Sequence, residues 1–313
     1  MIKVECSAIC GTDLRIYNGV PSQPNMVFPA VMGHEMADTV VAVGDQVSRG
    51  RIGQRVALET HAHCGECYLC KTSNKHVCLN RSTLKKYHGC FAEYKLTTEN
   101  MLYVLPDNIL FEEAAQYEPG GVAMYAMEES HMNPGDIVVI YGCGPIGLIA
   151  MQIFKAYGAG TVIGIGRNEF RLNMAKKYAD VVINGVKEPV LDIVREIAQA
   201  HGGADVIIET TAAASIYETM LQMARPEAHI IIVGFPGEVP IHIGKYIGSK
   251  GLNIKGNYGR KLWSSWEKLN DLVSSKRIDL LDIVTHRFTL EQYEEAFATR
   301  MKDSGKVLFV HNQ

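Results

Sequence analysis

The spacing of apolar segments in the second half of the chain predicts a parallel α/β sheet. Short apolar segments rich in β-branched residues are typical of strands buried on both faces, and amphipathic segments separate them. Strands that alternate with helices form right-handed βαβ units, so we predict a doubly wound sheet with its ligand at the carboxyl ends of the strands. The predicted strands are 137–141, 161–165, 181–183, 204–209, 229–233 and 252–255, and the predicted helices are 146–157, 168–178, 190–200 and 215–224.

The rest of the chain has shorter segments, and many of them are of strand type. A helix is predicted to begin near Glu112, and Pro119 predicts a break at Glu118, after which the helix resumes near Val122. We expect the segments beyond residue 257 to return to the first domain. The predicted strands are 2–6, 39–43, 91–96 and 306–310, and the late helices are 263–276 and 290–301. We therefore predict two domains, one built from 1–119 and 258–313 and the other from 120–257.

A glycine motif directly follows the predicted strand 137–141. Gly142, Gly144 and Gly147 have the spacing G-x-G-x-x-G, and Pro145 and Ile146 open the next helix. The first glycine allows a tight turn, the second lets the backbone approach a pyrophosphate, and the third lets the helix pack closely on the strand. Because the motif lies between a strand and a helix, it indicates dinucleotide binding rather than a turn with a purely structural role.

The end of the second strand indicates which dinucleotide binds. Proteins that bind NAD usually place an acid there to bind the ribose 2′-hydroxyl, whereas this chain has Gly166 followed by Arg167, with Arg171 one helical turn later. A guanidinium is well suited to pair with a 2′-phosphate. We therefore predict NADP in preference to NAD, although Glu169 weakens this case and Arg167 as a solvated surface residue is the alternative.

Four cysteines form the strongest local metal signal. Cys64, Cys67, Cys70 and Cys78 follow the pattern C-x2-C-x2-C-x7-C. Four thiolates close a tetrahedron around zinc and leave no open position, so we predict a structural zinc in the lobe 64–78. The alternative is a set of unrelated free or redox-active cysteines.

Composition narrows the function only a little. The chain has 313 residues, 21% of them charged, with a net charge of −3, which gives no reason to expect nucleic acid or an acidic membrane surface as a partner. No apolar segment reaches the length of a membrane span, and the first residues lack the apolar core of a signal peptide. We therefore expect a cytoplasmic protein whose partner is a small molecule.

In combination, the motifs resemble one family closely. Their order is Cys-Gly-Thr-Asp at 10–13, Gly-His-Glu at 33–35, the four-cysteine lobe, Glu-Pro at 118–119 and Gly-x-Gly-Pro-Ile-Gly at 142–147. This order is similar to that of the zinc-dependent medium-chain alcohol dehydrogenases, nearest to the sorbitol (polyol) and threonine dehydrogenase branches. The resemblance covers nearly the whole chain, and it implies a GroES-like catalytic domain interrupted by a Rossmann domain.

The resemblance also implies a second, catalytic zinc. Cys10, His34 and a glutamate would hold it, and both Glu35 and Glu118 match positions that the family places at or beside the metal. Such a zinc lowers the pKa of an alcohol, whose carbon then passes a hydride to the nicotinamide. Thr12 matches the hydroxyl that relays the alcohol proton. The family places Gly142, Gly144, Pro145, Ile146 and Gly147 at the pyrophosphate and Arg167 and Arg171 near the adenosine ribose.

This sequence departs from the family in several places. The family usually has additional strands before Ile2, and their absence is expected to affect the sheet of the catalytic domain. Arg15 stands where threonine dehydrogenases have a histidine in the proton relay, and Asp38 stands where the family has a glycine, so the loop under the zinc is expected to differ. Gly166 replaces the usual acid.

The function we expect is reversible hydride transfer between NAD(P) and a secondary alcohol or polyol. One alternative is an enzyme like L-threonine 3-dehydrogenase, and a further alternative is a zinc-stabilised nucleotide-binding protein with weak catalysis. By analogy with the same branch we expect a homo-oligomer, either a tetramer or a dimer.

Overall fold

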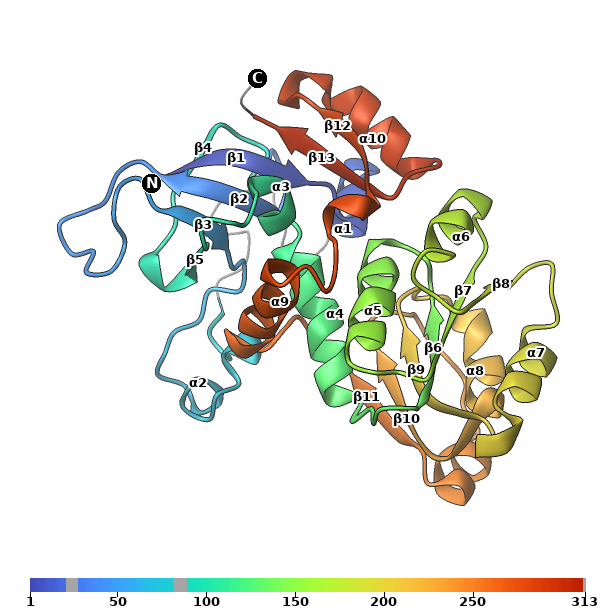
Figure 1. Ribbon diagram of the computed structural model, residues 1–313. Helices are drawn as coiled ribbons and strands as arrows, with labels where there is room; N and C mark the ends of the chain where they lie inside the picture. The colour runs from blue at the N-terminus through green and yellow to red at the C-terminus, as the bar shows by residue number, and fades with distance from the viewer. Residues whose placement is uncertain (21–27, 82–88, 312–313) are drawn as a thin grey trace. The chain divides into compact units, whose positions relative to one another are not determined.

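The computed structural model describes residues 1–20, 28–81 and 89–311, and the chain forms two compact units (Figure 1). The first unit consists of Met1–Pro119, Lys261–Ser274 and Leu280–Gln313. The second consists of Gly120–Arg260 and Ser275–Asp279. The second unit thus extends a little beyond residue 257 and also includes a short segment between two helices of the first unit.

The second unit contains a six-stranded sheet in which every pairing is parallel, in the order β11-β10-β9-β6-β7-β8. This arrangement confirms the doubly wound fold that the alternating segments predict. The strands are β6 (Ile137–Tyr141), β7 (Thr161–Gly166), β8 (Val181–Asn184), β9 (Ala204–Glu209), β10 (Ala224–Ile232) and β11 (Asn253–Gly256). The helices between them are α5 (Pro145–Ala156), α6 (Glu169–Ala175), α7 (Val190–Ile197) and α8 (Tyr217–Met223).

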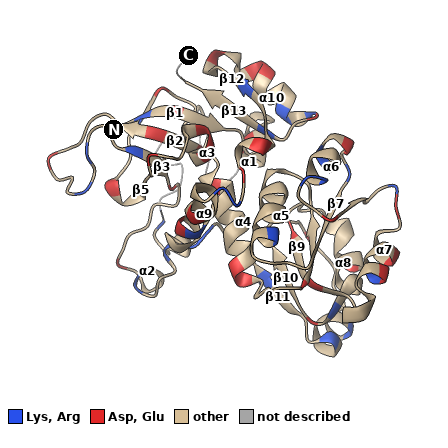
Figure 2. Cartoon of the chain, in the orientation of Figure 1, with Lys and Arg blue, Asp and Glu red and all other residues tan. Residues whose placement is uncertain are grey.

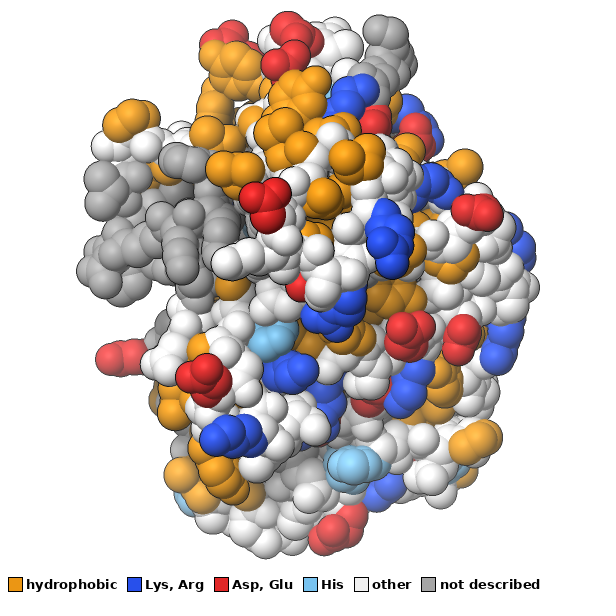
Figure 3. Space-filling view, turned by 90° about the vertical axis from the view of Figure 1, so that its left-hand side faces the viewer, with side chains coloured by type: hydrophobic (Ala, Val, Ile, Leu, Met, Phe, Trp, Pro, Cys, Tyr) orange, Lys and Arg blue, Asp and Glu red, His pale blue; other side chains and the backbone are white. Residues whose placement is uncertain are grey.

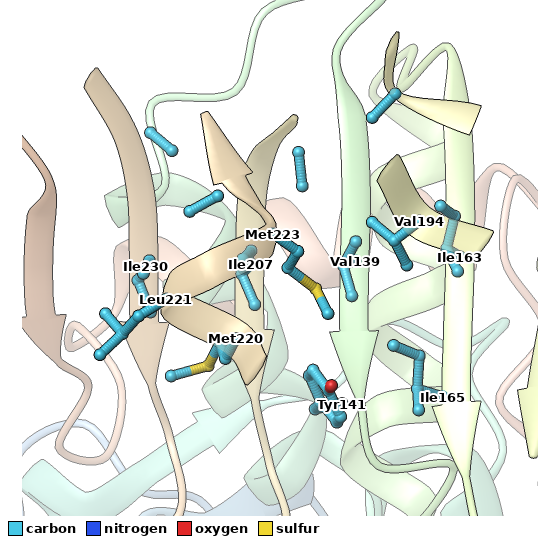
Figure 4. Close-up of a cluster of buried hydrophobic side chains, with 14 of the residues drawn as sticks. Val139, Tyr141, Ile163, Ile165, Val194, Ile207, Met220, Leu221, Met223 and Ile230 are labelled. Atoms are coloured by element: carbon cyan, nitrogen blue, oxygen red, sulfur yellow. The ribbon is translucent and has the colours of Figure 1, made fainter. Parts of the chain in front are cut away.

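The core of this unit explains why its strands are uninterrupted apolar segments. All five residues of β6 are buried. Val139 and Tyr141 lie on the face that packs against α7 and α8, where Val194 and Met220 meet them (Figure 4). Since successive side chains alternate between the two faces of a strand, the residues between them are buried on the other face, and the strand needs apolar side chains at every position.

The first unit is built around a seven-stranded sheet. Its order is β12-β13-β1-β2-β3-β5, with β4 paired to β1. All pairings are antiparallel except that of β12 with β13. The last strand of the chain, β13, pairs with the first, β1. The strands are β1 (Ile2–Ala8), β2 (Glu35–Val40), β3 (Arg55–Leu58), β4 (Tyr94–Lys95), β5 (Leu102–Val104), β12 (Val284–Phe288) and β13 (Lys306–Val310). The helices are α1 (Gly11–Tyr17), α2 (Tyr68–Lys71), α3 (Phe111–Ala114), α9 (Ser264–Ser274) and α10 (Tyr293–Met301), and α4 (Tyr117–Glu129) contains the boundary between the units.

The predicted helix break at Glu118 is wrong in its position. Helix α3 ends at Ala114, before the predicted break, and helix α4 runs without interruption from Tyr117 to Glu129, with Pro119 in its first turn. The first N–H groups of a helix have no intrahelical acceptor, so a proline there costs no hydrogen bond. Glu118 is therefore held on a helix and not on an irregular loop.

The predicted strands of the first unit differ from the observed ones at their ends. Strand β2 begins at Glu35, four residues before the predicted strand 39–43. The sequence pattern did not indicate this start, because Glu35 and Asp38 are acidic although nearly all residues of the strand are buried. The predicted strand 91–96 is reduced to β4, Tyr94–Lys95. Strands β3, β5 and β12 were not predicted, and each has five residues or fewer.

Charge is spread over both units. Basic and acidic residues are scattered through both units (Figure 2), and side chains of both signs are interspersed on the face in Figure 3. In the part of the chain that the structure describes, no helix has both the length and the apolar character needed to cross a bilayer.

Asp38 occupies the middle of strand β2, not the loop position expected from the family glycine. Its side chain is fully buried, and neither carboxylate oxygen has a hydrogen-bond partner among the described residues. Burial raises its pKa well above the usual value, although the charge of Lys95 opposes this shift. The nearest residues are apolar: Met36 and Val40 on the same strand, and Val4 and Val56 on the neighbouring strands.

We predict that Asp38→Val stabilises the protein, because an unpaired buried polar group costs about 1–3 kcal/mol. The raised folded-state pKa adds a second cost, which appears only where the unfolded chain has lost the proton. The gain should therefore be smallest near pH 4 and grow as the pH rises above the unfolded-state pKa of about 4. Thermal unfolding from pH 4 to 8 measures it. Thr39→Val, at the next position of the strand, is the control, and a lower midpoint for Asp38→Val at pH 7 would contradict the prediction.

Candidate active site

The four cysteines of the predicted lobe surround one point. Their sulfur atoms lie within 4.8 Å of one another. The separations are 3.9 Å for Cys64 and Cys70, 3.8 Å for Cys67 and Cys78, and 3.5 Å for Cys64 and Cys78. Four sulfurs at about 2.3 Å from a zinc ion in a tetrahedron are about 3.8 Å apart, so the lobe has the dimensions of a four-thiolate zinc site.

The chemistry of the lobe also fits a bound cation. Backbone N–H groups of Glu66 and Cys67 lower the pKa of Cys64 to about 6. Burial and the neighbouring sulfurs raise the pKa of Cys70 to about 12. The four sulfurs therefore cannot all be thiolates at neutral pH without a positive ion among them. A zinc ion held by all four would have no open coordination position.

Cys10, His34 and Glu35 form a second group whose ligand atoms lie within 4.8 Å of one another. The sheet brings them together. Strand β1 ends at Ala8, shortly before Cys10, and antiparallel β2 begins opposite it at Glu35, directly after His34. Thiolate, imidazole and carboxylate in this arrangement fit three protein ligands of a zinc ion with one position left for water or substrate.

Asp13, which the sequence motif contains but to which no role was predicted, holds this group in place. Its fully buried carboxylate accepts hydrogen bonds from the backbone N–H of Cys10 at 2.9 Å and of Gly33 at 3.3 Å. The same carboxylate lies 3.4 Å from Nδ1 of His34. A carboxylate behind a metal-binding histidine fixes the orientation of the ring. Asp13 also caps helix α1, and Thr12 is half-buried in the first turn of that helix.

Glu35 and Glu118 have different positions. Glu35 is almost completely buried and belongs to the metal group, whereas Glu118 is outside the sets of potential metal ligands found among the described residues. Burial raises the pKa of Glu35, as does the negative charge of Glu118, while Lys306 acts in the opposite direction. Glu118 is therefore close enough for its charge to act on Glu35. The local sequence around Lys306 does not indicate that it contacts Glu35, because the two residues are far apart in the chain and meet only through the pairing of β13 in the sheet.

The glycine motif forms the turn from β6 to α5 in the second unit. Gly142 has a φ of +108°, which favours glycine. A Cβ atom on Gly147 would lie 1.8 Å from the carbonyl oxygen of Gly142, so any side chain there would push the helix away from the strand. Gly144 caps α5, and a Cβ atom on it would meet no atom within 4 Å. Pro145, which has no backbone N–H, and Ile146 are the first residues of α5, and the N–H groups of a first helical turn can bind an anion.

The residues expected near the ribose follow strand β7 in the same unit. Gly166 ends β7, and Arg167 is exposed directly after it. Arg171 lies in α6, and its charge acts on Cys143 within the glycine turn. Glu169 is occupied elsewhere: it pairs with Lys187 at 2.6 Å.

Comparison with known proteins agrees with this geometry. The family model for the alcohol dehydrogenase GroES-like domain matches residues 1–107, and the model for zinc-binding dehydrogenase matches residues 145–275. An L-threonine 3-dehydrogenase from Bacillus subtilis (strain 168) is 38% identical over 315 residues, which cover 99% of this chain and 90% of that protein. The chain belongs to the zinc-dependent medium-chain dehydrogenases.

Solved structures of other dehydrogenases share the whole fold. An alcohol dehydrogenase from E. coli CFT073, in complex with NADH, has a TM-score of 0.89 and 29% identity over 99% of this chain and 90% of that one. The 2R,3R-butanediol dehydrogenase from Bacillus subtilis has a TM-score of 0.88 and 29% identity over 99% of this chain and 92% of that one. This dehydrogenase is accordingly a zinc-dependent oxidoreductase that acts on alcohols or polyols with a nicotinamide cofactor.

Two glycine variants should separate nucleotide binding from folding. We predict that Gly144→Ala folds normally, because its Cβ atom meets nothing, but binds NADPH more weakly, because the added methyl keeps the pyrophosphate from the backbone. Gly147→Ala should instead lower stability by about 1–3 kcal/mol or more, since the helix must move off the strand. Thermal unfolding and NADPH fluorescence titration measure the two effects. A Gly147→Ala variant as stable as the wild type would refute the packing argument.

Proposed function

We propose that this dehydrogenase oxidises a secondary alcohol, either a simple one or one within a polyol, by hydride transfer to NADP, and that it catalyses the reverse reaction. The observation that carries the proposal is the group formed by Cys10, His34 and Glu35. In a protein of this family, three such ligands with an open position are suited to activating an alcohol.

We assign each residue of the group a distinct task. Cys10, His34 and Glu35 hold the catalytic zinc, and the four-cysteine lobe holds a structural zinc. A zinc ion in the first site lowers the pKa of an alcohol so that it loses its proton near neutral pH. Thr12, the second residue of helix α1, relays that proton: its Oγ accepts the proton from the alcohol and passes its own hydroxyl proton on toward solvent, to which this half-buried residue is partly open. Asp13 keeps the ring of His34 oriented.

The preference for NADP is supported by the residues that follow β7. No acid is present at Gly166 to repel a 2′-phosphate, and the exposed guanidinium of Arg167 is available to pair with it. Glu169, the acid that argued against this preference, is neutralised by Lys187. Arg171 adds a second positive charge next to the glycine turn.

L-Threonine is the second candidate substrate, and the 38% identical relative from Bacillus subtilis favours it. Arg15 argues against it. This residue is exposed on α1, one turn after Thr12, where the threonine dehydrogenases are expected to have a histidine relay. A guanidinium stays protonated and cannot pass on a proton. The expected homo-oligomer and the cytoplasmic location stay predictions.

A cofactor-reduction screen tests the substrate. We expect faster reduction of NADP with polyols or simple secondary alcohols than with L-threonine, and no reduction after treatment with a zinc chelator. Cys10→Ser should abolish turnover while circular dichroism shows an unchanged fold, because it removes one ligand of the catalytic zinc only. A higher kcat/KM for L-threonine would replace the first candidate with the second. Undiminished turnover in Cys10→Ser would overturn the metal assignment.

The cofactor preference has its own test. We expect NADPH to bind more tightly than NADH, and Arg167→Ala to reduce the ratio of the two affinities by roughly tenfold, which corresponds to about 1.4 kcal/mol. Lys176→Ala, an exposed basic residue just beyond α6, is the matched control and should leave the ratio unchanged. Fluorescence titration at low salt measures both cofactors. Equal affinities in the wild type would disprove the NADP preference.

A further inference from the structure

A buried ion pair links the candidate metal group to the C-terminal strand. Nζ of Lys306 contacts Oε2 of Glu35, and the two side chains are 2% and 1% exposed. An ammonium and a carboxylate removed from water to this degree each need a charged partner, because an uncompensated buried charge is strongly destabilising. The carboxylate that belongs to the candidate metal group is thus already in contact with a cation supplied by the protein.

The sheet explains why a lysine reaches this position. Glu35 and Leu308 both lie opposite Ala8, so all three side chains are on one face of the sheet. Lys306, two residues before Leu308, is on the same face. Strand β1 separates β13 from β2, and two strand spacings amount to about 9.6 Å. The small side chain of Ala8 leaves room, and a long flexible side chain is needed to span the distance.

We propose that Lys306 is an internal counter-ion that takes the place of the catalytic metal at Glu35, so that Lys306 and the metal compete for one carboxylate. The metal-free protein then keeps its buried carboxylate paired and its site formed. When zinc binds, Glu35 is shared between two cations, and this lowers the affinity of the site and makes its metal exchangeable. The inference rests on the proposed metal role of Cys10, His34 and Glu35.

Other charges around the pair are consistent with this competition. Arg300 is also buried, and the charges of Cys10 and Glu35 act on its guanidinium. Its Nε donates to the carbonyl oxygen of Ile9 at 3.4 Å, so it is held by the backbone and not by Glu35. Glu118 adds a negative charge that acts on Glu35. Lys306 is therefore the cation with a direct contact to the ligand, and we assign the competition to it.

The test is the zinc affinity of the catalytic site in a double-mutant cycle. Lys306→Gln removes the competing charge but keeps a hydrogen-bond donor, so we expect zinc to bind on the order of tenfold more tightly. Zinc should also raise the thermal midpoint of Lys306→Gln by more than it raises that of the wild type, because only the metal-free variant has an uncompensated carboxylate at Glu35. Lys306→Arg keeps the charge and should bind zinc like the wild type. Competition with a chromogenic chelator measures affinity, and Cys10→Ser identifies which zinc belongs to this site.

Glu35→Gln completes the cycle. In this background Lys306→Gln should leave zinc affinity unchanged, because the lysine acts only through the carboxylate. The absorption spectrum of the Co²⁺-substituted protein gives a second readout that does not depend on turnover: Lys306→Gln should alter the bands of the Cys10 site and leave those of the four-cysteine lobe unchanged. If Lys306→Gln does not fold without metal, zinc affinities can still be measured for Lys306→Arg, for Glu35→Gln and for the double variant Glu35→Gln/Lys306→Gln. The proposal then requires that the double variant and Glu35→Gln bind zinc with equal affinity.

The outcomes separate this inference from the proposed function. Unchanged or weaker zinc binding in Lys306→Gln would overturn the competition and leave the dehydrogenase proposal intact. If instead the wild type held a single zinc that Cys10→Ser did not remove, the metal site itself would be wrong.

Discussion

The antiparallel pairing of β1 with both β2 and β13 is the constraint on which the candidate active site depends. Because β1 runs against both neighbours, its C-terminal end lies beside the first residues of the other two strands. Cys10 follows β1, Glu35 begins β2 and Lys306 begins β13, so three distant parts of the sequence meet at one end of a single sheet. Glu35 and Lys306 are held by the hydrogen bonds of the sheet, and Cys10 and His34 follow or precede its strands within two residues.

The two metal groups differ in ways that follow from their donors. The four-cysteine lobe is formed within fifteen residues by tight turns, helix α2 and one 3-10 turn, so its geometry is largely local. Its four sulfurs would surround a zinc ion completely, and such an ion would contribute to stability. The group at Cys10 takes its residues from the start of helix α1 and the start of strand β2, with the buried carboxylate of Asp13 behind the histidine. Three protein ligands would leave one coordination position of a zinc ion open, as catalysis requires.

Buried charge is a recurring feature of the first unit. Asp13 is compensated by backbone N–H groups and the imidazole, and Glu35 by Lys306. Asp38 lies on the same strand as Glu35 and has no hydrogen-bond partner among the described residues, so only the charge of Lys95 acts in its favour. Asp13 and Glu35 belong to or contact the candidate metal group, whereas Asp38 lies among the apolar residues of the sheet, where its burial lowers the stability of the fold.

In the second unit the corresponding constraint is steric, since Gly147 must let α5 approach Gly142.

The sequence by itself determined the features whose physics is local. Apolar segments at regular intervals defined the parallel sheet, the glycine spacing defined the nucleotide turn, and C-x2-C-x2-C-x7-C defined the metal lobe, because each needs only neighbouring residues. The break predicted at Pro119 failed because a proline in the first turn of a helix gives the same sequence signal as a helix end. Tertiary structure alone decided that Glu35 joins Cys10 and His34 while Glu118 lies beside them, that Asp13 orients the ring, and that Lys306 reaches Glu35 across β1. These contacts depend on the pairing of β1 with β2 and with the distant β13, and strand register leaves no mark on the local sequence.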